Sequence, residues 1–223
     1  MMLTVCIVDD HIIIRKHLSH IIQQHYVDVK ILEFENGLHL IQHFPKQQPS
    51  IVLMDISMPK MNGYDASQWL LQHHPSVPIL VVSDITDRDA ICMMRYLGVK
   101  GFLAKAEAIQ HLITAMEQTM KQRIYYHIGS NFKITNAQFT IKEQTIEKKL
   151  VLLTDKEKEI LQLICTNKSI EAIAQTASIS IRTYEKHKQN ISEKLDIKTR
   201  EGLMLYALTS GLVALQLATA NSI

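Results

Sequence analysis

Five polar residues interrupt the apolar runs in the first half of the chain. Asp9 and Asp10 end the first run, Asp55 the third, Ser83 the fourth and Lys105 the fifth. Three carboxylates that lie close together repel one another unless a cation neutralises them, and ligation by oxygen alone suits Mg²⁺. Beside a cation and a lysine, Asp55 would act as a nucleophile toward a phosphoryl group, because both positive charges stabilise the transferring oxygens. The Ser83 hydroxyl would bond a third phosphoryl oxygen.

The apolar runs predict the sheet that would hold these residues. Runs 3–8, 51–54 and 77–82 are continuous rather than alternating, which is typical of strands buried on both faces of a parallel sheet. Weaker runs occur at 29–34 and 101–104. Helix-length stretches separate the runs, at 12–25, 37–44, 64–74, 87–97 and 107–121. The pattern predicts an α/β domain with a doubly wound, five-stranded parallel sheet, in which ligands bind beyond the carboxyl ends of the strands.

Four of the five polar residues at strand ends also have an ordinary structural explanation. Asp9 and Asp10 would cap the following helix, Ser83 would be a bonded core hydroxyl, and Lys105 would be a surface charge. Four strand ends carrying such residues favour a shared site.

The second half of the chain is predicted to be helical. A capping box, Thr154-Asp-Lys-Glu157, begins one helix, three more follow at 169–176, 180–195 and 199–210, and Gly211 is placed to cap the last. Residues 122–150 show no lasting periodicity, although 132–135 and 138–142 are candidates for short strands. We therefore expect an α/β domain at 1–121, a linker at 122–150, a small all-α domain at 151–213 and a tail at 214–223.

Composition and charge exclude several classes of protein. With 47% hydrophobic and 21% charged residues, the chain is neither disordered nor fibrous. Its net charge of +2 divides into −2 over 1–121, +3 over 122–150 and +1 over 151–223. The three cysteines lack disulfide or zinc spacing, and no apolar stretch approaches the roughly 18 residues of a membrane helix. We expect a cytoplasmic protein without a membrane partner.

The stretch 180–195 has the pattern of an amphipathic helix with a basic face. Ile181, Tyr184, Ile191 and Leu195 trace a packing side, and the local net charge over 180–200 is +3. This pattern is typical of a helix-turn-helix, and it also fits a solvated surface helix.

The motifs of the first domain resemble the receiver domain of bacterial two-component response regulators, which has a flavodoxin-like fold. The motifs are Asp9-Asp10-His11, the segment 55–63, Ser83 and Gly101-Phe-Leu-Ala-Lys105. The resemblance implies that Asp55 accepts a phosphoryl group from a sensor histidine kinase. It implies that Asp10 binds Mg²⁺ directly, Asp9 through water and Ser57 through its carbonyl. It also makes Ser83 and Phe102 the switch residues.

The helical domain resembles the LuxR-type helix-turn-helix, through Leu153 to Glu157, Ile173-Ala174, 180–195 and 207–213. With the receiver this makes a NarL-type regulator, expected to bind promoter DNA as a homodimer. RNA polymerase is a further partner if the protein activates transcription. By position on the recognition helix, base edges are expected to contact Glu185, Lys186 and Gln189, and phosphates to contact Arg182, Thr183, Lys188 and Lys194.

Three residues depart from the patterns of these families, and other functions compete with the one implied by the resemblance. Asp84 adds a carboxylate next to Ser83 where the family usually has a small or apolar residue, Ala106 replaces a common Pro, and Tyr184 replaces a common Val.

The Asp84 carboxylate favours a rival function in which the receiver is a phosphate-independent dimerisation module. A haloacid dehalogenase-type phosphatase needs a second Asp where Ser57 stands, so we expect no enzyme, and a small-molecule quorum regulator would not explain the acidic site.

The eleven histidines raise the question of a metal site. His39 and His43 have helical i, i+4 spacing, but no third ligand is evident, so we expect a solvated face.

Overall fold

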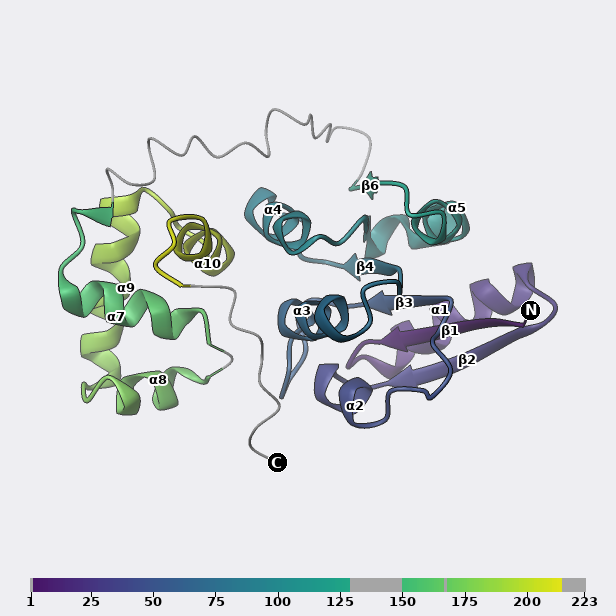
Figure 1. The fold of residues 1–223 in the computed structure, drawn as a ribbon, viewed down its shortest axis with the longest axis horizontal. Coiled ribbons are helices and arrows are strands. Elements are labelled where there is room, and N and C mark those ends of the chain that lie inside the picture. The colour runs from purple at the N-terminus through teal and green to yellow at the C-terminus, as the bar shows by residue number, and fades with distance from the viewer. Residues whose placement is uncertain (1, 129–149, 167, 214–223) are drawn as a thin grey trace. The chain divides into compact units, whose positions relative to one another are not determined.

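The computed structural model describes residues 2–128, 150–166 and 168–213, and the chain divides into two compact units, Met1–Ile134 and Thr135–Ile223 (Figure 1). The first unit contains β1 (Leu3–Val8), α1 (Ile12–His25), β2 (Val29–Phe34), α2 (Gly37–Gln42), β3 (Ile51–Met54), α3 (Gly63–His73), β4 (Ile79–Ser83), α4 (Arg88–Leu97), β5 (Gly101–Ala104), the 3₁₀ turn η1 (Lys105–Glu107), α5 (Ala108–Met120) and β6 (Tyr125–His127). This alternation confirms the predicted α/β class.

The strands of this unit form one parallel sheet in the order β2-β1-β3-β4-β5-β6. The expected number of five strands is wrong by one, because β6 pairs with β5 at the edge of the sheet. Strand β6 lies within the segment expected to be a linker. It has three half-buried residues, too few to produce the apolar pattern from which the other strands are predicted.

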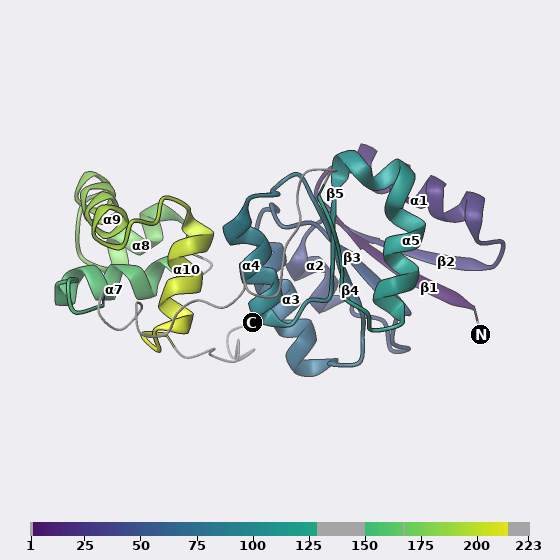
Figure 2. The same ribbon diagram turned by 90° about the horizontal axis from the view of Figure 1, so that it is seen from above.

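Helices cover both faces of the sheet, as Figure 2 shows, with α1 and α5 on one face and α2, α3 and α4 on the other. Leu18 and Ile22 of α1 and Leu112 and Met116 of α5 pack in one cluster with the inward side chains of the central strands. Strands β3, β4 and β5 are buried along their whole length, as their continuous apolar runs predict.

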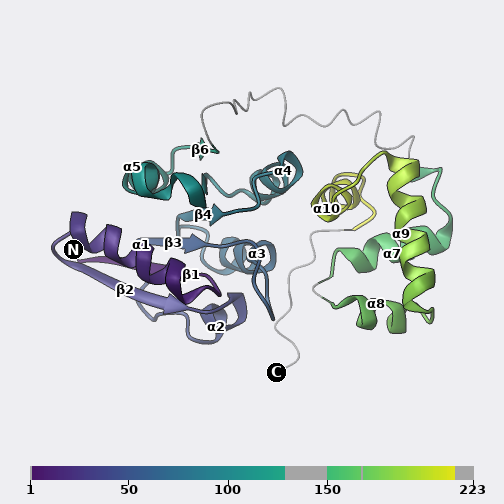
Figure 3. The same cartoon turned by 180° about the vertical axis from the view of Figure 1, so that it is seen from behind.

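The second unit contains four helices among its described residues: α7 (Asp155–Ile164), α8 (Ile170–Thr176), α9 (Ile181–Leu195) and α10 (Arg200–Thr209). Figure 3 shows α9 crossing α7, against which it packs. A serine or threonine side chain accepts a backbone N–H at the start of each helix, at Thr154, Ser169, Ser180 and Thr199. The predicted capping box is confirmed, and Gly211 follows α10 with a φ of +72° that favours glycine.

The expected packing side of α9 is partly right. Tyr184, Ile191 and Leu195 are buried, and Tyr184 therefore occupies the inward position. The expectation for Ile181 is wrong, because Ile181 is the first residue of the helix and is 48% exposed.

Some expectations concern residues outside the described ranges, namely the short strands at 132–135 and 138–142 and the tail at 214–223. Within the described ranges, no helix has the length and apolarity needed to cross a bilayer.

Candidate functional site

The register of the sheet brings the predicted polar residues to one edge. Val8 pairs with Met54, so Asp9 and Asp55 leave their strands at the same level. On the other side, Ser83 ends β4 opposite the last residue of β5, and Lys105 follows. Three neighbouring loops therefore supply the acidic, hydroxyl and ammonium groups at the carboxyl ends of the strands.

Lys105 joins two buried carboxylates at this edge. Its Nζ lies 2.7 Å from Oδ2 of Asp9 and 3.0 Å from Oδ2 of Asp55. The three side chains are between 2% and 8% exposed, so these charges interact with little screening by water. The backbone N–H of Ile56 donates to the other carboxylate oxygen of Asp55 over 2.8 Å. The Asp55 carboxylate is thus held in one orientation by groups on both of its oxygens.

Burial and the neighbouring charges act in opposite directions on the pKa values of Asp55 and Lys105. Burial raises the pKa of Asp55 above its ordinary value, although the Lys105 ammonium and a hydrogen bond from Ser83 act to lower it. Burial alone would lower the pKa of Lys105, but hydrogen bonds and attraction from Asp9 and Asp55 outweigh burial and raise it. A protonated lysine is therefore retained beside the two carboxylates.

Asp10 and His11 form the outer part of the site. Asp10 is exposed, and its Oδ1 lies 2.9 Å from Nδ1 of His11. The backbone N–H of His11 donates to Oδ1 of Asp9 over 2.7 Å. Ligand atoms of Asp9, Asp10, His11 and Asp55 all lie within 4.8 Å of one another. The imidazole of His11 also belongs to this group. The sequence motif Asp9-Asp10-His11 contains this residue but does not predict a role for it.

Arg15 supports the first strand end and was also missed. Its side chain is buried, and Nη1 donates to the carbonyl oxygen of Asp9 over 2.6 Å. Nε of the same guanidinium donates to Glu33 at 3.3 Å, and Lys16 donates to the other oxygen of Glu33 at 2.8 Å. The sequence carries no signal for this support, because the contact depends on the direction and burial of the Arg15 side chain.

The loop after Asp55 requires a glycine. A Cβ added to Gly63 would clash with the carbonyl oxygen of Asp55, and the Gly63 N–H donates to the carbonyl of Ile56. Asn62 begins α3 by accepting the N–H of Asp65. The start of α3 therefore packs directly on the backbone of Asp55. Ser57, the expected carbonyl ligand, is exposed at the beginning of this loop.

The expected switch residues are buried. Ser83 is 1% exposed, and its Oγ accepts the N–H of Ile85 over 3.3 Å. Phe102 is fully buried, and its ring stacks on that of Tyr126 in β6 with centroids 6.1 Å apart. Asp84 is exposed and does not belong to the group of clustered ligand atoms, so its carboxylate is separated from the buried one of Asp55.

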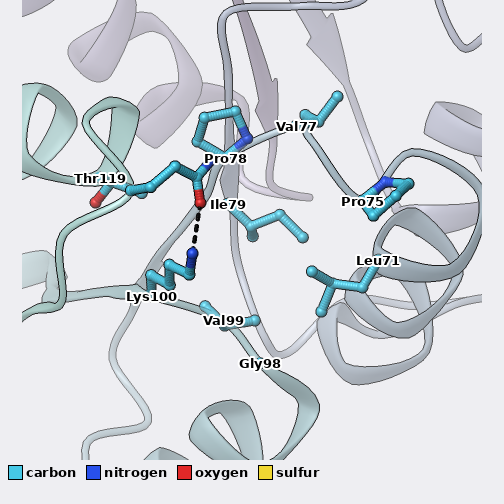
Figure 4. Close-up of a pocket in the computed structure, with 10 residues that line it drawn as sticks. Leu71, Pro75, Val77, Pro78, Ile79, Gly98, Val99, Lys100 and Thr119 are labelled. Atoms are coloured by element: carbon cyan, nitrogen blue, oxygen red, sulfur yellow. Dashed lines mark hydrogen bonds between the residues drawn. The ribbon is translucent and has the colours of Figure 1, made fainter.

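A pocket of the first unit lies at the other end of the sheet. Figure 4 shows it around Ile79 at the start of β4 and Lys100 just before β5. A hydrogen bond of 2.8 Å from Lys100 to Gln122 lies along one side. The acidic residues are at the opposite ends of these strands, so this pocket is not part of their site.

Most of the side chains expected to contact DNA lie on the exposed face of α9. Arg182, Thr183, Glu185, Lys186 and Gln189 are exposed, and Lys188 is half-buried. Arg182, Lys186 and Gln189 follow one another at intervals of four and three, so they share a face of the helix. Tyr184 lies on the buried side. The helix therefore packs through one side and presents a polar side with two cationic groups.

Lys194 has an internal partner. Its Nζ lies 2.6 and 2.9 Å from the two carboxylate oxygens of Glu157, which is 3% exposed. Glu157 also accepts the backbone N–H of Thr154 over 2.7 Å. The ion pair therefore links α9 to the capping box of α7, and the Lys194 ammonium is directed into the domain.

Known families match both units. Residues 5–117 match the response regulator receiver domain, and residues 151–207 match the luxR family of bacterial regulatory proteins. The transcriptional regulatory protein DegU of Brevibacillus brevis is 28% identical over 222 residues, covering 94% of each chain. MctR of Rhizobium johnstonii, also a transcriptional regulatory protein, is 31% identical over 166 residues, covering 74% of each. The two-component response regulator RcsB, solved as a DNA complex, is 25% identical with a TM-score of 0.52, covering 94% of this chain and 99% of the other.

The matched ranges contain the acidic strand ends and the exposed face of α9. The chain therefore belongs to the response regulator family, as a two-component transcriptional regulator in which a receiver domain precedes a LuxR-type DNA-binding domain.

Proposed function

We propose that this regulator is controlled by transfer of a phosphoryl group from a sensor histidine kinase to Asp55, and that the phosphorylated form binds promoter DNA as a dimer. The observation that carries this proposal is Lys105, whose ammonium lies within 3.0 Å of Asp9 and Asp55 at the carboxyl ends of the strands. A lysine so placed can bind an oxygen of an incoming phosphoryl group while it keeps the acceptor oriented.

The residues at this edge fit Mg²⁺. Lys105 supplies one positive charge against the carboxylates of Asp9, Asp10 and Asp55, so the cluster carries excess negative charge. Asp10 and Asp55 would bind the ion directly, Asp9 through water and Ser57 through its carbonyl. Bound there, Mg²⁺ would neutralise the carboxylates and withdraw charge from the phosphoryl oxygens.

The chain itself supplies the acceptor and its orientation. A carboxylate oxygen of Asp55 forms a bond to phosphorus while the bond from phosphorus to the kinase histidine breaks, and the histidine nitrogen keeps the electron pair. The product is an acyl phosphate on Asp55. Ser57 stands where a phosphatase of the haloacid dehalogenase type has its acidic group, so the chain lacks that catalyst at this position. Asp55 is accordingly an acceptor rather than a turnover nucleophile.

The switch couples Asp55 to the faces around β4 and β5. Ser83 turns its hydroxyl toward the phosphoryl oxygens, and Phe102 moves into the space that Ser83 leaves. The face built from residues 87–121 then changes shape, which favours dimerisation through it or frees α9 for DNA.

Intact mass after incubation with Mg²⁺ and acetyl phosphate tests the acceptor. We expect a gain of about 80 Da that requires Mg²⁺ and is absent from Asp55→Asn. Asp84→Asn is the matched control, because Asp84 is an exposed aspartate of the same edge, and it should still gain the mass. If neither acetyl phosphate nor a cognate kinase modified the wild type, the phosphate-independent dimerisation module would replace this proposal.

DNA contacts come from the exposed side of α9. Glu185, Lys186 and Gln189 contact base edges in the major groove, and Arg182, Thr183 and Lys188 contact phosphates. Lys194 is omitted from these contacts, because its ammonium is bound to Glu157. Arg182→Ala should weaken binding to any duplex. It should also reduce the slope of the logarithm of the binding constant against the logarithm of salt concentration by about one in magnitude. Unchanged binding would contradict the assignment of this face to DNA.

A further inference from the structure

A second group of metal-ligand side chains lies in the receiver unit and shares no residue with the acidic site. It consists of Glu107, His111 and His127, whose ligand atoms all lie within 4.8 Å of one another. Two imidazoles and one carboxylate are a ligand set typical of zinc and related divalent transition metals. Phosphoryl transfer and DNA binding, as proposed above, use none of these three residues.

Two separations between the ligand atoms are close to those in a coordination sphere. Oε2 of Glu107 lies 3.3 Å from Nε2 of His127 and 3.7 Å from Nε2 of His111. Ligands on a tetrahedral zinc ion with bonds of about 2.0 to 2.1 Å are separated by roughly 3.3 to 3.4 Å. Both imidazoles therefore direct the same kind of nitrogen at one carboxylate oxygen, at nearly the distances that a shared ion requires.

Ordered elements of the fold hold the three ligands. Glu107 ends η1 directly before α5, and His111 follows one turn later, so the i, i+4 spacing brings the two side chains to the same side. His127 ends β6, where it pairs with Leu103 of β5. The neighbouring Tyr126 hydroxyl donates to the carbonyl of Val99 over 2.6 Å and anchors the strand. The site therefore needs little rearrangement to bind an ion.

The group is also accessible. The three side chains are between 30% and 32% exposed, so an ion can enter and water can complete its coordination. The ring centroids of His111 and His127 lie 3.9 Å apart, so the two imidazoles are neighbours beside the same carboxylate. Without a metal ion, both imidazoles contact the Glu107 carboxylate directly, and zinc titration distinguishes this arrangement from a bound ion.

Another histidine pair of the receiver, on α2, provides a contrast. His39 and His43 have the same i, i+4 spacing, with ring centroids 4.8 Å apart. Nδ1 of His43 is bonded to the carbonyl of His39, and no carboxylate joins this pair in the groups found among the described residues. Glu107 and His111 share this i, i+4 spacing with His39 and His43, and the third ligand, His127, distinguishes the proposed site.

We propose that Glu107, His111 and His127 bind one zinc-like divalent transition-metal ion, which ties β6 to α5. Mg²⁺ is a poor occupant, because it prefers oxygen ligands. Since the interdomain segment continues from β6, the ion would fasten the start of that segment to the receiver.

Zinc titration of the full chain by calorimetry tests the site. Saturating Mg²⁺ is present throughout, and zinc that binds at His11 and the acidic group would appear equally in every variant. We expect the wild type to bind one more equivalent than His127→Gln, or to bind it at least about tenfold more tightly. His43→Gln is the matched control and should titrate like the wild type. Identical isotherms for His127→Gln and the wild type would overturn the proposal.

A second variant guards against a loss of folding at β6. His111→Gln changes a helix surface rather than the strand, so it should lose the same equivalent while its circular dichroism stays unchanged. Cobalt(II) provides a spectroscopic check, since visible absorption from a low-symmetry imidazole site should appear in the wild type and not in His111→Gln.

Amide hydrogen exchange tests the tie between the elements. Zinc should slow exchange at residues 125–127 in the wild type and in His43→Gln, and should leave it unchanged in His111→Gln. Zinc binding at Glu107 without slower exchange in β6 would contradict the tie.

Discussion

Replacing Lys194 with methionine separates a structural role from a DNA-binding role. Methionine keeps much of the aliphatic length of the side chain and removes the ammonium that lies 2.6 Å from Glu157. The carboxylate of Glu157 is 4% exposed, so the variant leaves a buried charge without its ion pair. Two donors of Thr154 remain, at 2.7 and 3.0 Å. We therefore expect Lys194→Met to destabilise the helical domain and to leave its DNA-facing side intact.

The magnitude follows from burial. Removing one partner of a fully buried ion pair costs about 3 to 5 kcal/mol. Lys194 is 35% exposed and screened by water, and the Thr154 donors persist, so about 1 to 2 kcal/mol is expected. For a domain of this size, that corresponds to a fall of roughly 4 to 16 °C in the Tm of its transition.

Calorimetric unfolding of the full chain, with hydrogen exchange to assign the transition to α7 and α9, measures this loss. Lys188→Met is the matched control, because Lys188 is on the same helix and its partner Glu185 is 4.0 Å away and 50% exposed. The control should lose less than about 0.5 kcal/mol and should weaken DNA binding. If Lys194→Met kept the wild-type stability and showed a weaker salt dependence of DNA binding, the structural role of Lys194 as the partner of Glu157 would be refuted.

Three further predictions concern the receiver, its last strand and the capping box. Gly63→Ala should slow phosphorylation by acetyl phosphate roughly tenfold to a hundredfold, measured by intact mass, because the added carbon would displace the backbone of Asp55; wild-type kinetics would show that the loop absorbs the change. Tyr126→Phe removes the 2.6 Å hydrogen bond to Val99, so the free energy of local opening in β6 should fall by about 1 kcal/mol and amide exchange there should become faster. Unchanged exchange would contradict this role of the hydrogen bond. Burial alone would raise the pKa of Glu157, but its hydrogen bonds lower it, so its stabilising effect is present above the ordinary carboxyl range and is lost as pH falls through the lowered pKa. Urea unfolding of the helical domain should show this acid loss, and Glu157→Gln should reduce it.

Patterning predicts the acidic site because parallel strands end together. Asp9, Asp55 and Lys105 follow continuous apolar runs, and the register of the sheet then determines that they meet. The supports around them depend on side-chain direction. Arg15 reaches back to the carbonyl of Asp9, a contact that no periodicity describes.

The structure adds to or departs from the sequence-based expectations where a contact spans distant parts of the chain or an element is short. Lys194 has the charge expected of a phosphate contact, but its partner Glu157 is 37 residues away and buried. Ile181 fits the helical spacing, yet it lies at the first position of α9 and remains exposed. His127 could be linked to His111 only once β6 was known to pair with β5.

The position of β6 also decides where the receiver can be cut. A fragment that ends at residue 121, the boundary expected from patterning, would lose the partner of β5 and expose unpaired backbone from Gly101 to Leu103. It would also remove Tyr126 from the ring of Phe102 and uncover apolar surface. An open strand beside an uncovered aromatic ring is a template for intermolecular pairing, whereas a three-residue strand offers little length for it. Fragments that extend to residue 128 should therefore stay monodisperse at concentrations where the shorter one aggregates.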